Sequence, residues 1–105
     1  MQNILIIDTS DNKTIKIGLE TNGKEEVIVS DSRNLKSQAC LFLIEKVLKQ
    51  KKLKLEDLSS IKVNKGPGSF TGLRVGISIA NALSFLLKIP INDKKIGDLE
   101  EPVYN

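Results

Sequence analysis

The segment best suited to binding a ligand is a glycine-rich stretch between a predicted strand and a predicted helix. It consists of Gly66, Pro67, Gly68, Ser69, Phe70, Thr71 and Gly72. Backbone N–H groups in this position can cradle a phosphate, but the stretch lacks both the Gly-Lys-Thr/Ser ending of a P-loop and the glycine spacing of a dinucleotide-binding turn. A structural role is therefore favoured, in which Gly66 and Gly68 adopt special backbone angles. Pro67 then stiffens the turn, and Ser69 or Thr71 caps the helix.

Two further places carry side chains with reactive groups. Asp8, followed by Thr9 and Ser10, could hold a metal-bound phosphate through its carboxylate and the two hydroxyls. A nucleotide cleft there needs a second lobe, and 105 residues are too few to supply one, so an Asx turn is the favoured interpretation. Cys40 lies in an apolar helical run without a neighbouring base, which is typical of a small buried hydrophobic residue.

The sequence contains no histidine, and this excludes several classes of reaction from the chain acting alone. Serine triads, cysteine–histidine pairs and ordinary zinc sites all use an imidazole. We therefore expect none of these three chemistries from this chain alone. The formal charge is +3, and 14 of the 16 positive residues are lysines, so contact with nucleic acid is allowed but not demanded.

The cysteine count and the N-terminal residues bear on the compartment. Cys40 is the single cysteine and cannot form an internal disulfide, while Met1 leads directly into a strand-like segment without a signal-peptide pattern. The longest apolar run has about six residues, whereas a bilayer-spanning helix needs about 20. The expectation is a soluble, cytoplasmic protein without a membrane partner.

The hydrophobic pattern predicts three antiparallel strands, a helix, a fourth strand and a second helix. The strands are expected at residues 4–7, 13–20, 25–30 and 59–64, and the helices at residues 36–51 and 71–88. Asn22-Gly23 suits the type I′ turn of a hairpin, and Pro90 stops the second helix. This order predicts an α/β fold in one domain, with a mixed sheet and helices packed on it. The tail from about residue 92 is expected to be weakly structured.

The second predicted helix is apolar over more of its circumference than one sheet can cover. Its polar side holds Arg74, Ser78, Asn81, Ser84 and Lys88, with Ile77 and Phe85 among them. Apolar and small residues fill an arc of about 180°, whereas a core-facing stripe needs about 100°. Within that arc Gly72, Gly76 and Ala80 form a line along which another backbone could approach closely. A bulkier strip beside it consists of Val75, Ile79, Leu83 and Leu86.

The first predicted helix has a similar surplus of apolar surface. Cys40, Ile44, Val47 and Leu48 form its core face, while Phe42 projects towards the charged side. An exposed aromatic residue beside charged residues is a common interface anchor. The partner surface on this helix is expected to include Lys36, Ala39, Phe42, Leu43 and Lys46. The alternative is that the two helices simply bury against each other and the sheet.

The motif GPGSFTGLRV at residues 66–75 and its continuation GISIANALSFLLKIP resemble the TsaB family, as does ILIIDTS at residues 4–10. The resemblance covers nearly the whole chain and implies the N-terminal half of an actin-like, ribonuclease-H-like ATPase fold. It also implies a non-catalytic subunit, with no catalytic residue, metal or cofactor of its own, that pairs through these two helices with TsaD. TsaD carries the metal, the nucleotide cleft and the transfer chemistry that makes threonylcarbamoyladenosine beside the tRNA anticodon.

The sequence departs from the family pattern in two places. Lys36 stands where the family usually has a histidine that opens the first helix, which removes a metal role there. The second domain of ordinary members is also absent, so we expect this chain to be a single TsaB-like N-terminal domain over residues 1–105.

The resulting hypothesis is a non-catalytic scaffold that binds and activates a TsaD-like subunit. The ATPase subunit of the same complex is a second candidate partner, tRNA is involved indirectly, and the chain alone is expected to dimerise through the same helices. On this view Gly76→Leu abolishes partner binding while the isolated chain stays folded.

Two rival functions are a homodimeric nucleotide-binding protein that uses the GPGSFTG loop and a tRNA-binding module that uses the lysines after Val47. The tRNA-binding module is the weaker of these two hypotheses, because the chain has few aromatic residues on which bases can stack.

Overall fold

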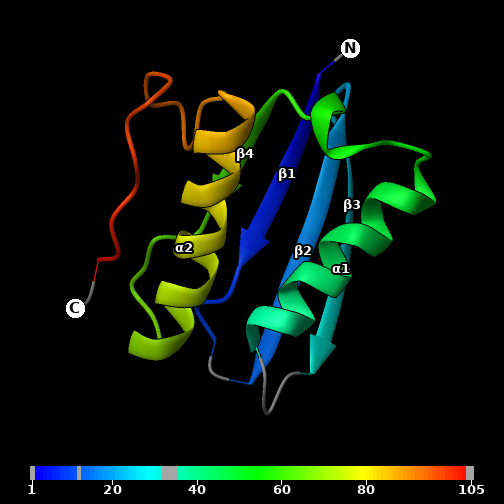
Figure 1. Ribbon diagram of the computed structural model, residues 1–105. Helices are drawn as coiled ribbons and strands as arrows, with labels where there is room; N and C mark the ends of the chain where they lie inside the picture. The colour runs from blue at the N-terminus through cyan, green and yellow to red at the C-terminus, as the bar shows by residue number, and fades with distance from the viewer. Residues whose placement is uncertain (1, 12, 32–35, 104–105) are drawn as a thin grey trace.

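The computed structural model of the protein describes residues 2–11, 13–31 and 36–103. Its strands are β1 (Asn3–Asp8), β2 (Thr14–Thr21), β3 (Lys24–Asp31) and β4 (Ser60–Val63), and its helices are α1 (Lys36–Gln50), the short 3-10 helix η1 (Leu55–Asp57) and α2 (Phe70–Leu87). The strands form one sheet in the order β3-β2-β1-β4, in which β1 runs antiparallel to β2 and parallel to β4 (Figure 1). The predicted α/β class and mixed sheet are confirmed.

The hairpin between β2 and β3 forms where the sequence predicts it. Asn22 and Gly23 have φ angles of 53° and 83°, the two positive values that a type I′ turn requires. The turn sets the register, in which Thr21 lies opposite Lys24 and Thr14 opposite Asp31. The sequence therefore fixes this hairpin locally.

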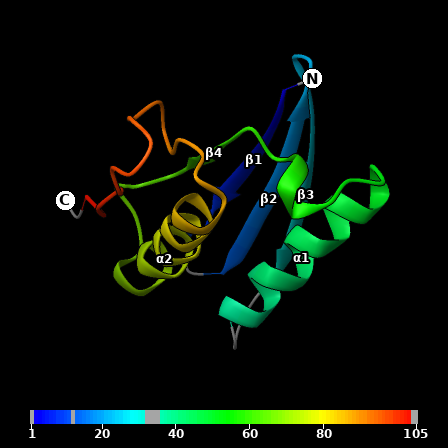
Figure 2. The same ribbon diagram turned by 45° about the horizontal axis from the view of Figure 1, so that its top comes forward.

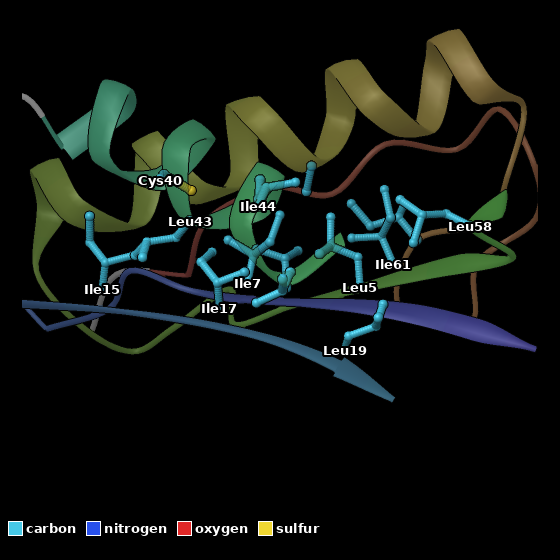
Figure 3. Close-up of a cluster of buried hydrophobic side chains, with 14 of the residues drawn as sticks. Leu5, Ile7, Ile15, Ile17, Leu19, Cys40, Leu43, Ile44, Leu58 and Ile61 are labelled. Atoms are coloured by element: carbon cyan, nitrogen blue, oxygen red, sulfur yellow. The ribbon is translucent and has the colours of Figure 1, made fainter. Parts of the chain in front are cut away.

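Both helices cover the same face of the sheet (Figure 2). β1 alternates between buried and half-buried residues, so that Leu5 and Ile7 point into the layer between sheet and helices. The core between the layers is apolar (Figure 3), and its buried members are Leu5, Ile7, Ile15, Ile17, Leu19, Cys40, Leu43, Ile44, Val47, Leu48, Leu58, Ile61, Val63, Leu73, Ile77, Ala80 and Ile91.

The core face of α1 is broader than the sequence pattern suggests. Leu43 is buried beside Cys40 and Ile44, in the i, i+3, i+4 spacing of a core-facing helix. The prediction that Leu43 belongs to a partner surface is therefore wrong. Burial raises the pKa of the Cys40 thiol to about 11, so the thiolate, the reactive form, is scarce at neutral pH.

A threonine from the end of β1 fixes α2 on the sheet. The Thr9 hydroxyl donates to the Gly72 carbonyl oxygen at 2.6 Å and accepts from the Gly76 N–H at 3.0 Å. A Cβ atom on Gly76 would clash with Thr9 Oγ1 and would lie 3.2 Å from Ile7 Cγ2. The close approach along Gly72, Gly76 and the buried Ala80 is therefore made by this chain's own sheet.

Glycine and alanine in α2 thus do not admit a partner helix, which corrects the prediction that Gly72, Gly76 and Ala80 lie in a partner interface. Two residues on the predicted polar side of α2 are also buried. Ile77 lies in the core, and the Ser84 hydroxyl donates to the Ile89 carbonyl at 2.7 Å. The C-terminal tail runs beside α2 (Figure 1), where Asn81 is hydrogen-bonded to the Glu100 backbone and Ile77 lines a hollow with Glu100 and Pro102.

The tail from residue 91 onwards is held by side-chain hydrogen bonds, although the described residues in it form little regular structure. Ile91 makes an isolated parallel bridge with Ile61 at the outer edge of β4. The Asn92 side chain accepts from Val63 N at 2.8 Å and donates to Val63 O at 2.9 Å, as a neighbouring strand would. The prediction of a weakly structured tail does not include these contacts, although the described tail residues beyond Ile91 form no helix or strand.

Glu100 connects this tail to the rest of the domain. Its backbone is bonded to the Asn81 side chain of α2, and its carboxylate accepts from Asn92 and from the Glu101 N–H. Lys65 and Lys94 lie 3.9 and 3.8 Å from one carboxylate oxygen. Burial alone would raise the pKa of Glu100, but these hydrogen bonds and positive charges outweigh it and lower the pKa.

A lowered pKa makes the stability of the fold sensitive to acid. The contribution of Glu100 to the free energy of unfolding is complete above the ordinary pKa of 4.5 and is lost as the pH falls through the lowered value. We expect Glu100→Gln to flatten the urea-unfolding stability curve between about pH 5 and pH 3. An equally steep curve in the variant would show that the acid sensitivity arises elsewhere, for example at Asp8.

Among the helices in the described part of the chain, α2 is long and apolar enough to cross a membrane by length and composition. Core helices of globular domains meet the same criterion, and α2 packs against β4, β1 and α1.

Candidate partner interface

The glycine-rich loop is occupied by contacts within the chain. Gly66 has a φ of 125°, and its N–H donates to Asn64 Oδ1 at 2.9 Å. The Ser69 N–H donates to the Ser10 carbonyl at 2.8 Å. Ser69 Oγ accepts from the Gly72 N–H at 3.3 Å and so caps α2 as predicted. Since these N–H groups already have partners, the loop is built to position the start of α2.

Gly68 serves the loop through space and not through a special backbone angle. A Cβ atom there would lie 2.6 Å from the Ser10 carbonyl oxygen. The absent side chain lets the loop pack against the end of β1, which carries Ser10 just beyond it.

Asp8 forms the predicted Asx turn at the end of β1. Its Oδ1 accepts from the Ser10 N–H at 3.0 Å and from Ser10 Oγ at 2.6 Å, and its Oδ2 accepts from Asn64 Nδ2 at 3.3 Å. Burial would raise the pKa of Asp8, but hydrogen bonds from Ser10 and Asn64 and the charge of Lys16 lower it. Within residues 2–11, 13–31 and 36–103, no three His, Cys, Asp or Glu side chains gather closely enough to hold a metal ion.

The outward side of α2 exposes three large apolar side chains as well as Arg74 and Ser78. Phe70, Phe85 and Leu86 are 57%, 73% and 71% exposed. Half-buried residues of the same helix, Val75, Ile79 and Leu83, continue the strip towards α1. Phe85 and Leu86 are adjacent to each other and, with the half-buried strip, form the kind of apolar patch that marks a protein-binding surface, while Phe70 lies at the first residue of the helix.

The outward side of α1 adds two more exposed apolar side chains. Leu41 is 52% exposed and Phe42 is 66% exposed. Between the helices lies a groove of about 390 Å³, lined mainly by Leu41, Ile44, Leu48, Leu53, Leu55 and Leu83. Phe42 lies outside the lining of this groove, next to Glu45 and Lys46. We call Leu41, Phe42, Phe70, Phe85 and Leu86, with the half-buried Val75, Ile79 and Leu83, the helical surface.

The predicted interface residues differ in their exposure to solvent. Phe42, Lys46 and Leu86 are exposed, and Ala39, Val75, Ile79 and Leu83 are half-buried. Leu43, Gly72, Gly76 and Ala80 are buried within this chain. Lys36 begins α1, but its side chain lies outside the described part of the structure.

The sequence prediction omitted Leu41, Phe70 and Phe85 from the interface. The signal for Phe85 was present, because this aromatic residue fell on the polar side of the helical wheel. The sequence pattern places Phe70 in the loop, whereas it is the first residue of α2.

Similarity to known proteins places the chain in a family. A family model described as "TsaD: tRNA N6-adenosine threonylcarbamoyltransferase" matches residues 30–93. The tRNA threonylcarbamoyladenosine biosynthesis protein TsaB of Buchnera aphidicola subsp. Schizaphis graminum is 45% identical over 92 residues, which are 84% of this chain and 41% of that protein. The chain belongs to the TsaB family. The resemblance found in the GPGSFTGLRV motif is thereby confirmed.

The fold of this TsaB-family chain is shared with a solved structure. YeaZ from Pseudomonas aeruginosa superposes with a TM-score of 0.81 at 26% sequence identity, over 90% of this chain and 44% of that one. The chain thus spans about half the length of the relatives it matches. A tRNA N6-adenosine threonylcarbamoyltransferase of Anaplasma phagocytophilum matches a shorter part, with 45% identity over 47% of this chain and 14% of that protein.

Proposed function

We propose that this TsaB-family chain acts in threonylcarbamoyladenosine biosynthesis as a non-catalytic subunit, which binds and activates a TsaD-like catalytic subunit. The observation that carries the proposal is the helical surface. It exposes five large apolar side chains on two neighbouring helices, and nothing in the described part of the chain covers them. Exposed aromatic residues of this kind are the usual anchors of protein interfaces.

The chain resembles both TsaB proteins and tRNA N6-adenosine threonylcarbamoyltransferases, and this supports a pairing of related subunits. The chain matches a relative named TsaB over most of its length and a tRNA N6-adenosine threonylcarbamoyltransferase over about half. Two chains with a common fold can pack through equivalent helices in a nearly two-fold arrangement. The helical surface then meets its counterpart on the catalytic subunit, and the free chain is expected to pair with a second copy of itself.

The chemistry of the side chains supports a non-catalytic role. Cys40 is buried with a raised pKa, and the Asp8 carboxylate accepts hydrogen bonds from Ser10 and Asn64. Reactive groups in enzymes are instead accessible and aimed at a substrate. In this proposal tRNA is bound by the whole complex, which lies in the cytoplasm, and not by this chain alone. The ATPase subunit binds to the same complex.

The first test is the solution mass of the chain, measured by light scattering after size exclusion. The chain is run alone and then mixed with the TsaD-like protein from the same genome. We expect a heteromeric peak to replace the peaks of the separate proteins. Two unchanged peaks at micromolar concentrations would contradict the proposed function.

A further inference from the structure

Arg74 is the only charged residue of α2, whose 18 residues are otherwise apolar, small or neutral. The side chain is exposed, and its guanidinium carbon lies 5.5 Å from the centre of the Phe70 ring. A cation over an aromatic face is held there by the quadrupole of the ring. Arg74 thus presents a fixed positive charge within the apolar helical surface.

A hollow of about 390 Å³ lies beside this charge. Its lining includes Ser37 from the start of α1 and, from α2, Phe70, Val75, Ser78 and Ile79. Thr71 and Arg74 complete the lining, so the hollow combines apolar walls with three hydroxyls and one guanidinium.

No carboxylate in the described residues forms an ion pair with Arg74. Glu100 lines a neighbouring hollow together with Arg74, but its carboxylate lies against Lys65 and Lys94. On α1, Glu45 is 2.7 Å from Lys49. The donors of the Arg74 guanidinium are therefore open towards the outside of the molecule.

A protein that covers the helical surface removes water from Arg74 as well as from the apolar side chains. A guanidinium that loses water without gaining an acceptor weakens binding strongly, whereas a carboxylate matches its planar donors with two parallel hydrogen bonds. We propose that Arg74 is the polar anchor of this interface and that the partner protein places an aspartate or glutamate in the hollow beside Phe70. This inference rests on the proposed function.

The surroundings favour a protein carboxylate over an RNA phosphate. Proteins that bind nucleic acid neutralise several phosphates with clustered cations, whereas α2 carries a single charge among apolar residues. Phe70 is already covered on one face by Arg74, so that face cannot stack on a base.

The test measures the affinity of the full chain for the TsaD-like protein from the same genome, by titration calorimetry. Arg74→Met keeps a long side chain on Phe70 without the charge, and Arg74→Glu reverses the charge. We expect an affinity loss of about 10-fold or more for the first and about 100-fold or more for the second, with Arg74→Lys between wild type and Arg74→Met. Lys95→Glu, an equal charge change at an exposed tail residue, is the matched control and should stay within about 3-fold of wild type.

The outcomes separate the two proposals. If Arg74→Met binds the TsaD-like protein as tightly as the wild type does, the inference about a partner carboxylate is overturned. The proposed function then still holds. Failure of the wild-type chain to bind overturns the proposed function and this inference with it. A loss of tRNA affinity in Arg74→Met, with protein affinity intact, would assign the charge to a phosphate and overturn the inference. Melting temperatures followed by circular dichroism should be alike for all variants, because Arg74 is exposed.

Discussion

Replacing Gly76 with leucine is expected to unfold the isolated chain. The new side chain would start in the space that Thr9 Oγ1 occupies, with Ile7 Cγ2 only 3.2 Å from the Cβ atom. It would also displace the Thr9 hydroxyl from the Gly72 carbonyl and the Gly76 N–H, two buried hydrogen bonds between β1 and α2. Overpacking and the loss of these bonds together cost about 4 kcal/mol, a large fraction of the stability of a small domain.

The measurement is urea unfolding followed by circular dichroism, with Ala82→Leu as the matched control. Ala82 is exposed on the same helix, so the same side chain there meets solvent and should leave the midpoint nearly unchanged. A Gly76→Leu chain that unfolds at the wild-type midpoint would show that α2 does not depend on the contact with Thr9. The result expected here is opposite to the prediction from the sequence, in which Gly76→Leu impairs only partner binding.

A double-mutant cycle locates the cause of this destabilisation. Gly76→Ala should destabilise the wild-type chain but should do less harm in a Thr9→Ala background, because the clashing hydroxyl is then gone. Additive effects of the two substitutions would indicate that the cost comes from elsewhere in the helix.

Replacing Phe85 and Leu86 together with glutamine is expected to weaken binding of the TsaD-like subunit strongly while the chain stays folded. Both side chains are more than 70% exposed, so the core loses little. Glutamine is also a good helix former. If the two residues anchor the interface, the affinity should fall by about 30-fold or more.

Ile96→Gln with Leu99→Gln provides the control for a change in surface hydrophobicity. These tail residues are 63% and 51% exposed and lie outside the helical surface. The control pair should bind as the wild type does. Equal losses from both double variants would mean that general hydrophobicity, and not the helical surface, drives the association.

The sequence determined the elements of this fold and the character of its motifs. Alternation in β1 and β2, the Asn22-Gly23 turn and the helical spacing of Cys40, Ile44 and Val47 are local patterns, and local patterns dictate local structure. The same holds for the Ser69 cap and the Asx turn at Asp8. In each, a side-chain oxygen accepts a hydrogen bond from a backbone N–H two or three residues further along the chain. The exposure of Phe42 also followed from its place on α1.

The tertiary structure alone decided which apolar strip of α2 faces inward. Periodicity shows that Gly72, Gly76 and Ala80 share a line, but it does not show that Thr9, more than 60 residues away in the sequence, inserts its hydroxyl there. Likewise, Ile77 lies in the core and lines a hollow with Glu100 and Pro102 of the tail, and Ser84 is buried with its hydroxyl on the Ile89 carbonyl. Contacts between distant segments leave no period in the sequence, so the division between core and partner surface required the assembled fold.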